Sequence, residues 1–109
     1  GNYYYIGRKD DQVKIQGYRI ELAELEVAAS KLFPDSPSVA IGYQTEELWY
    51  LALFVKQSSI DEFQTQQLLK GILPAYMLPH RIHTLAEIPL NANGKTDRNA
   101  LRKIAQAQH

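Results

Sequence analysis

The chain has 109 residues, 45% of them hydrophobic and 22% charged, which is typical of one compact soluble domain. Twelve basic side chains balance twelve acidic ones, so no overall field attracts nucleic acid, and no apolar run reaches the roughly 18 residues of a membrane span. The absence of cysteine excludes disulfides, thiol catalysis and zinc–thiolate sites. We therefore expect a cytoplasmic protein without nucleic-acid or membrane partners.

Two β-favouring runs open the chain and are expected to form a hairpin. Residues 3–6 are tyrosine-rich, and residues 12–16 alternate polar and apolar side chains, as a half-buried strand does. From Ile20 the apolar spacing changes to three and four residues, which predicts a helix with one apolar face. The apolar positions of this helix are Leu22, Leu25, Ala29 and Leu32.

Two further strands are expected in the middle of the chain, at residues 39–43 and 48–55, because both runs are rich in β-formers. The second run is apolar throughout, which predicts a central strand covered on both faces. Ser59 followed by Glu62 has the pattern of a capping box that opens a second helix.

The last third of the chain is expected to contain a loop between Pro74 and Pro79, a short strand at residues 81–85 and a helix from about Asp97. The whole order predicts an α+β fold, in which a small β-hairpin is followed by a mixed three-stranded sheet flanked by helices. Such a fold alone assigns no function.

The three histidines, His80, His83 and His109, have no carboxylate or cysteine at ligand spacing. We therefore expect surface or interface histidines and no metal site.

Two local clusters precede and follow the middle strands. Residues 7–21, GRKDDQVKIQGYRIE, place basic side chains on a strand between glycine turns, and the plain interpretation is a hairpin with a solvated charged face. Residues 73–79, LPAYMLP, have the plain interpretation of a helix-to-strand connection.

A third cluster is formed by residues 93–98, NGKTDR. The Asn-Gly pair predicts a turn, Thr96 or Asp97 caps the following helix, and Lys95 stands at the tip. A lysine in such a turn is ordinarily only solubilising.

Taken together and in this order, the clusters resemble motifs of the C-terminal subdomain of adenylate-forming enzymes, specifically the adenylation domains of nonribosomal peptide synthetases. The first cluster and its continuation to Glu26 resemble the hinge motif G-R-x-D-x-Q-V-K-I-x-G-x-R-I-E-L-x-E-I-E. The second resembles L-P-x-Y-M-I-P and the third N-G-K-x-D-R. Gln16, Ala23 and Leu78 depart from the usual residues, but none stands where chemistry is expected.

The resemblance implies that this chain is a mobile lid over a large N-terminal core domain. The core domain would hold the carboxylate substrate, Mg²⁺ and most of the ATP contacts, and it lies outside this sequence. Residues 1–17 would form the hinge and hairpin, and residues 18–109 an α/β sandwich. We expect the lid to be inactive by itself.

The resemblance also implies residue roles in the first half-reaction, which joins the substrate carboxylate to AMP. Lys95 would be catalytic, bridging the carboxylate and nucleotide oxygens as negative charge accumulates between them. Arg8 would contact the ribose and Arg19 would approach the phosphates, because the guanidinium donors match paired oxygens.

In the second half-reaction, the phosphopantetheine thiol of a carrier protein attacks the acyl adenylate and releases AMP. The resemblance implies that the lid rotates about Asp10, so that Lys95 leaves and the Gly17 loop with Lys14 faces the site. Gly17 would leave the pantetheine path open because it has no side chain. The expected function is therefore the lid of a ligase that activates an amino acid or related carboxylic acid and loads a carrier protein.

Two alternatives stay open. The lid of an acyl-CoA or aryl-CoA ligase has the same fold, and such a ligase delivers the acyl group to free coenzyme A. The residues of the first and third clusters nevertheless favour the peptide synthetase branch. A non-catalytic protein-binding module is the alternative from another class, and ATP–pyrophosphate exchange with the core domain would argue against it.

Overall fold

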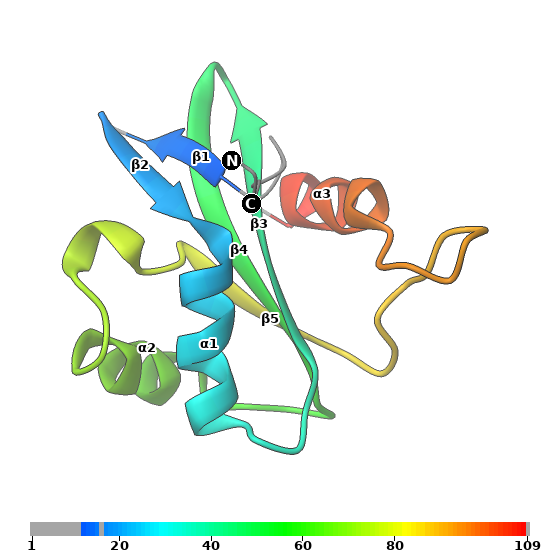
Figure 1. Cartoon of the computed structure of the whole chain (residues 1–109), viewed down its shortest axis with the longest axis horizontal. Helices are drawn as coiled ribbons and strands as arrows, with labels where there is room; N and C mark the ends of the chain where they lie inside the picture. The colour runs from blue at the N-terminus through cyan, green and yellow to red at the C-terminus, as the bar shows by residue number, and fades with distance from the viewer. Residues whose placement is uncertain (1–11, 16, 109) are drawn as a thin grey trace, which may run out of the picture.

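The computed structural model describes residues 12–15 and 17–108, which contain both strands and helices (Figure 1). In chain order they are β1 (Gln12–Ile15), β2 (Tyr18–Glu21), α1 (Leu22–Leu32), β3 (Ser38–Thr45), β4 (Leu48–Lys56), α2 (Glu62–Lys70), the 3-10 helix η2 (Ala75–Met77), β5 (Arg81–Leu85) and α3 (Arg98–Ala107). This order confirms the predicted α+β fold with a small hairpin and a three-stranded sheet.

Strand β4 is the centre of the main sheet, whose order is β3-β4-β5. Strand β3 pairs with it in antiparallel fashion and β5 in parallel fashion, so the sheet is mixed as predicted. Residues 51–55 of β4 are buried, which confirms a central strand covered on both faces.

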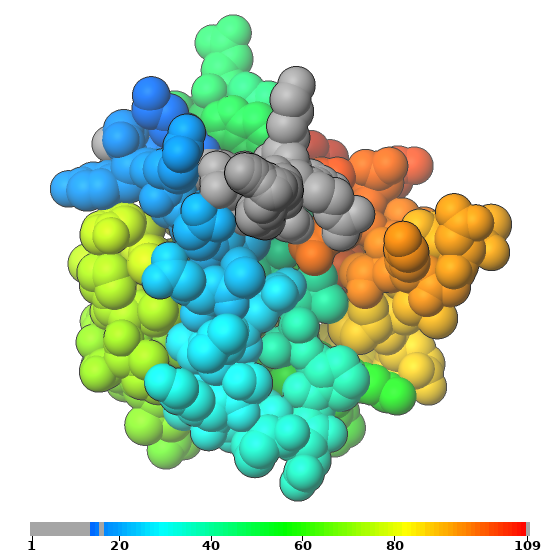
Figure 2. Space-filling model, in the orientation of Figure 1, coloured from blue at the N-terminus to red at the C-terminus, as the bar shows by residue number. Residues whose placement is uncertain are grey.

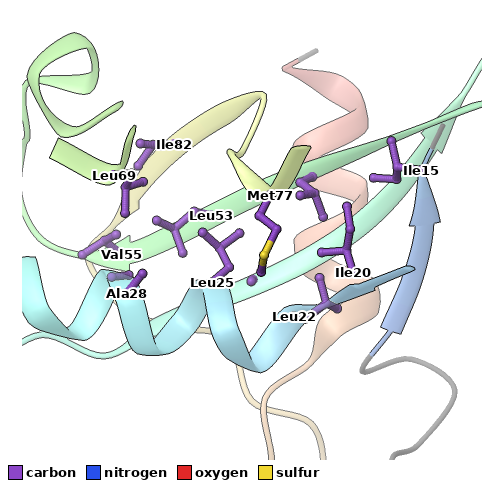
Figure 3. Close-up of a cluster of buried hydrophobic side chains, with 13 residues drawn as sticks. Ile15, Ile20, Leu22, Leu25, Ala28, Leu53, Val55, Leu69, Met77 and Ile82 are labelled. Atoms are coloured by element: carbon purple, nitrogen blue, oxygen red, sulfur yellow. The ribbon is translucent and has the colours of Figure 1, made fainter. Parts of the chain in front are cut away.

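Different helices cover the two faces of this sheet. Helices α1 and α2 lie on one face, over the larger of two hydrophobic clusters (Figure 3). In that cluster Leu25 of α1 and Leu69 of α2 pack with Leu53 of β4. Helix α3 lies on the other face, where Leu101 packs in a second cluster with Phe54. The sheet therefore separates α3 from the other two helices.

The β1–β2 hairpin is held to the main body by its apolar residues. Ile15 and Ile20 are buried in the larger cluster (Figure 3). Gly17, in the turn, has a φ of +86°, which a glycine adopts without the steric penalty of a side chain. The expected boundary between residues 17 and 18 falls at this turn and stays a prediction.

The start of the first helix differs from the prediction. Helix α1 begins at Leu22 and not at Ile20, because Tyr18–Glu21 pairs with β1 as strand β2. The observed hairpin partner of β1 therefore follows it in sequence, whereas the partner expected at residues 3–6 lies outside the described residues.

The cap of α2 also differs from the prediction. Asp61, not Ser59, is the N-cap, and its Oδ1 accepts a hydrogen bond from the backbone N–H of Gln64 at 2.9 Å. Glu62 is the first helical residue and turns its carboxylate to β5, where it accepts from the backbone N–H of Ile82 at 3.0 Å. Asp61 and Gln64 are themselves three residues apart, a spacing that could have identified the true cap.

Candidate functional site

Lys95 lies in a tight turn just before α3. The backbone N–H of Asn91 donates to the Lys95 carbonyl at 2.7 Å, and Asn91 Oδ1 accepts from the Lys95 N–H at 3.1 Å. Gly94 takes the left-handed conformation with a φ of +78°, and Leu90 and Thr96 form an antiparallel bridge across the base. The predicted Asn-Gly turn is therefore confirmed, and Lys95 is exposed on it.

Asp97 joins this turn to α3. Its Oδ1 accepts from the backbone N–H of Ala100 at 3.1 Å, so Asp97 and not Thr96 is the helix cap. Its own backbone N–H donates to the carbonyl of Pro89 at 2.8 Å. Lys95 thus stands on a segment that is hydrogen-bonded on both sides of it.

An open hollow borders the Lys95 turn and carries an excess of positive charge. Among the described residues, its lining includes the cationic groups of Lys95, Arg98 and Arg102 and the carboxylate of Asp97. Arg102 also donates through Nε to the carbonyl of Gly42 at 3.3 Å, which ties it to strand β3. This charge pattern suits an anionic ligand.

The β1–β2 hairpin brings together three other predicted site residues, Lys14, Gly17 and Arg19. Lys14 and Arg19 are direct cross-strand partners, and both side chains are exposed. Like charges placed opposite each other destabilise a hairpin, and a bound anion would offset that repulsion. Among the described residues, nothing lies within 4 Å of the position that a Cβ on Gly17 would occupy, so none of them crowds the turn.

The double-proline loop supports this hairpin, a role that its plain interpretation as a helix-to-strand connection did not include. The Tyr76 ring, in η2, stacks on Tyr18 with ring centroids 4.2 Å apart and planes 11° apart. The next residue, Met77, is buried in the cluster that contains Ile15 and Ile20 (Figure 3). The first and second motifs come together only in the folded chain. Their aromatic residues, Tyr18 and Tyr76, are the sequence features that could have indicated this contact.

The two groups of predicted site residues lie on opposite sides of the molecule. Figure 1 shows the orange turn that contains Lys95 at the far right and the blue hairpin at the upper left, and Figure 2 shows the same separation on the surface. The structure therefore groups Lys14, Gly17 and Arg19 and separates them from Lys95. Arg8 and Asp10 lie outside the described residues.

His83 is buried, contrary to the expectation of a surface histidine. It is 8% exposed on β5, and its ring stacks on Phe54 with centroids 4.9 Å apart. Its Nε2 is buried and has no hydrogen-bond partner among the described residues. Burial lowers the pKa of His83, and the nearby positive charge of Arg81 lowers that pKa further.

His80 remains exposed, as expected, and its Nδ1 accepts from the backbone N–H of Leu51 at 3.1 Å. Within residues 12–15 and 17–108, no group of three or more His, Asp or Glu side chains is placed to hold a metal ion. In the same part of the chain, no helix has the length and apolar character needed to cross a membrane.

Comparisons with curated proteins give relatives that match nearly the whole chain, although no family model matches it. The chain is 39% identical over 112 residues to an L-allo-isoleucine:holo-[CmaA peptidyl-carrier protein] ligase of Pseudomonas savastanoi pv. glycinea, covering 98% of this chain and 19% of the relative. It is 40% identical over 109 residues to surfactin synthase subunit 2 of Bacillus subtilis strain 168, covering 99% of this chain and 3% of the relative. The chain thus spans less than a fifth of the length of these relatives.

Solved structures that are similar to this chain indicate the same family as these relatives. A holo four-domain nonribosomal peptide synthetase bound to AMP and glycine is 36% identical, with a TM-score of 0.74 over 86% of this chain and 7% of the larger one. Apo MatB from Rhodopseudomonas palustris is 26% identical, with a TM-score of 0.77 over 90% of this chain and 20% of that one. The chain therefore belongs to the adenylate-forming enzymes, as a C-terminal subdomain of the kind found in the adenylation domains of nonribosomal peptide synthetases.

Proposed function

We propose that this chain is the mobile C-terminal lid of an ATP-dependent ligase. The ligase activates an amino acid or related carboxylic acid as its acyl-AMP and transfers the acyl group to the phosphopantetheine thiol of a carrier protein. The similarity to a ligase whose name includes a peptidyl-carrier protein supports this assignment. The partners are an N-terminal adenylation core domain and the carrier protein, and the expected compartment is the cytoplasm.

The separation of Lys95 from the hairpin is the observation that carries the proposal. Both regions have exposed cationic side chains, yet they lie on opposite sides of one folded unit (Figure 1). Such a unit cannot present both sides to one active site at the same time. Two half-reactions at that site therefore require two orientations of the lid.

Lys95 acts in the first half-reaction. The substrate carboxylate forms a bond to the α-phosphorus of ATP as the bond to pyrophosphate breaks, and the anionic groups repel one another. The Lys95 ammonium, held at the tip of a hydrogen-bonded turn, stabilises the negative charge in the transition state. Arg8 contacts the ribose, while the core domain binds Mg²⁺ and most of the ATP. Arg19 lies on the hairpin beside Lys14, so it approaches the nucleotide phosphate in the orientation that presents the hairpin.

The hairpin acts in the second half-reaction, after the lid has rotated about Asp10. The thiol sulfur attacks the acyl carbon, and AMP leaves with the bonding electrons. Gly17 leaves room for the pantetheine chain, since no atom of the described residues lies within 4 Å of where its Cβ would be. Lys14 lies on the adjoining strand β1 with its side chain exposed.

The Lys95→Ala variant tests the first assignment in the full-length ligase. ATP–pyrophosphate exchange should fall by about 100- to 1,000-fold, the typical loss for one transition-state charge contact. Loading of the carrier from pre-made acyl adenylate should stay near the parent rate, because Lys95 has left the site by then. An equal loss in both reactions would contradict the assignment, and loading of free coenzyme A in place of the carrier would favour an acyl-CoA ligase.

The Gly17→Leu variant tests the second assignment, with Gly17→Ala as its matched control. Both variants place a side chain at a φ of +86° and share a backbone penalty of about 1 to 2 kcal/mol. Only leucine adds bulk that obstructs the pantetheine path, so carrier loading should fall much further for Gly17→Leu while pyrophosphate exchange is retained. The two half-reactions are measured separately, and equal loading by the two variants would reject an obstruction.

A further inference from the structure

Arg98, the first residue of α3, makes contacts that join three elements. Its Nη1 donates to the carbonyl of Ala40 at 2.9 Å, and its Nη2 lies 3.8 Å from Oε2 of Glu26. The same Oε2 accepts from the backbone N–H of Ala40 at 2.9 Å. Both backbone groups of one β3 residue are therefore bonded to this ion pair, and we refer to Glu26, Arg98 and Ala40 as the α1–α3 clamp.

The clamp is partly shielded from water. The side chains of Arg98 and Glu26 are 22% and 28% exposed, and Ala40 is fully buried. Water competes less with hydrogen bonds in such a setting, so these contacts hold their geometry better than a surface ion pair would. The guanidinium suits this position because its planar fork reaches a carbonyl and a carboxylate together.

Each of the two charged residues of the clamp lies on a helix that adjoins one of the two proposed functional regions. Glu26 lies on α1, which begins immediately after strand β2 of the hairpin. Arg98 lies three residues after Lys95 and directly after the cap residue Asp97. The clamp therefore connects the hairpin side of the lid to the Lys95 side across the edge of β3.

We infer that Glu26 and Arg98 are positioning residues for Lys95, an inference that rests on the proposed function of that lysine. The clamp fixes the first turn of α3 against the sheet and so fixes where the Lys95 ammonium lies relative to the hairpin. A lid with this fixed geometry withdraws Lys95 and presents Lys14 and Gly17 in a single rotation.

The rest of α3 has its own hydrogen bonds to β3 and its own core contacts, so the loss of the clamp acts mainly on the first turn of the helix. One turn further along, Arg102 donates to the carbonyl of Gly42, and Gln106 then donates to the carbonyl of Gln44 at 3.0 Å. Leu101 is fully buried in the core. A variant of Arg98 therefore retains most of the seating of α3 while it frees the segment beside Lys95.

The test uses Arg98→Met in the full-length ligase. The kcat of adenylation should fall by about 10- to 100-fold, because a small displacement of a transition-state contact has an effect of this size. The ratio kcat/KM should fall in proportion, since the contact acts in the transition state and not in substrate binding. Carrier loading from pre-made acyl adenylate should remain near the parent rate.

A double variant separates positioning from a general structural role. If Arg98 acts through Lys95, adding Arg98→Met to Lys95→Ala should cause no further loss of adenylation. The control Gln106→Met removes the same kind of side-chain bond to β3 at the far end of α3, and it should leave adenylation within about twofold of the parent.

Two milder variants keep the test decisive if Arg98→Met does not fold. Glu26→Gln retains an acceptor for Ala40 but loses the charge, and Arg98→Lys retains the charge but loses the fork; both should slow adenylation selectively. Additive losses in the double variant, equal losses in the two half-reactions, or full activity of all clamp variants would overturn the inference. A Lys95→Ala enzyme as active as its parent would instead overturn the proposed function.

Discussion

A buried imidazole on β5 makes the stability of this chain depend on pH. His83 is 8% exposed, and its Nε2 has no hydrogen-bond partner among the described residues. Burial lowers its pKa, the charge of Arg81 lowers it further, and the carboxylate of Glu62 opposes them weakly. In the unfolded chain the same side chain titrates near its ordinary pKa of about 6.5. Below that pH the unfolded state binds a proton that the folded state binds less readily, so stability falls.

Acidification from about pH 7.5 to pH 5.5 should therefore lower the free energy of unfolding, and part of this loss should disappear in His83→Phe. Phenylalanine keeps a ring against Phe54 and removes the titrating nitrogens. Urea denaturation of both proteins across this range measures the difference. An unchanged pH dependence in the variant would show that His83 does not cause it.

Residue roles divide into those visible in the sequence and those that depend on distant contacts. The turn before α3 and a cap at Thr96 or Asp97 could be predicted, because an Asn-Gly pair and an N-cap act within a few residues. The contact between Glu26 and Arg98 could not, although both belong to recognised motifs. Their meeting point is Ala40, an alanine on β3 that carries no signal of its own in the sequence.

Helix side chains cover both edges of the main sheet in similar ways. Glu26 and Arg98 bond Ala40 on β3, while Glu62 accepts from the backbone N–H of Ile82 on β5 and from Arg81 Nε at 3.2 Å. Unpaired groups on an edge strand can pair with another chain. On each edge strand, one backbone N–H donates to a carboxylate that also contacts an arginine, so this N–H is not available to pair with another chain.

The Glu62→Ala variant tests the cap on β5. It leaves the Ile82 N–H and the Arg81 Nε without their shared acceptor, although Arg81 Nη1 still donates to the carbonyl of Gln108, and the chain should lose about 1 to 3 kcal/mol of stability. Ser59→Ala is the matched control, since Asp61 caps α2 and the hydroxyl of Ser59 is not needed for it. Chemical denaturation compares the two variants, and equal stabilities would reject the edge cap.

The two wrong element boundaries have different physical causes. The helix expected from Ile20 begins two residues later because β1 takes Tyr18–Glu21 as its partner. Ser59 is not the cap because Asp61, two residues later, accepts from the backbone N–H of Gln64 and caps the helix itself, while the Glu62 carboxylate bonds β5. The α3 start and the strand at Arg81–Leu85 were predicted well, since local sequence signals mark both. Strand pairing decided the first of these boundaries, and a neighbouring local cap decided the second.

The whole lid must turn as a unit if both of its functional sides are to serve one active site. The main sheet, its helices and the hairpin share core clusters, and the clamp joins α1 to α3. These contacts leave little freedom for the Lys95 turn to move separately from Lys14 and Gly17. The rotation should therefore arise in the chain before β1, where the resemblance assigns the pivot to Asp10.

The Asp10→Pro variant of the full-length ligase tests that pivot. Proline fixes φ near −65° and removes a backbone donor, so it restricts the torsional change that a hinge requires. If this angle suits the adenylating orientation, pyrophosphate exchange should persist while carrier loading collapses, because the hairpin can no longer reach the site. The two half-reactions and the melting temperature are measured together. Full carrier loading would reject Asp10 as the hinge, whereas loss of both reactions with a lowered melting temperature would show only damage to the hairpin.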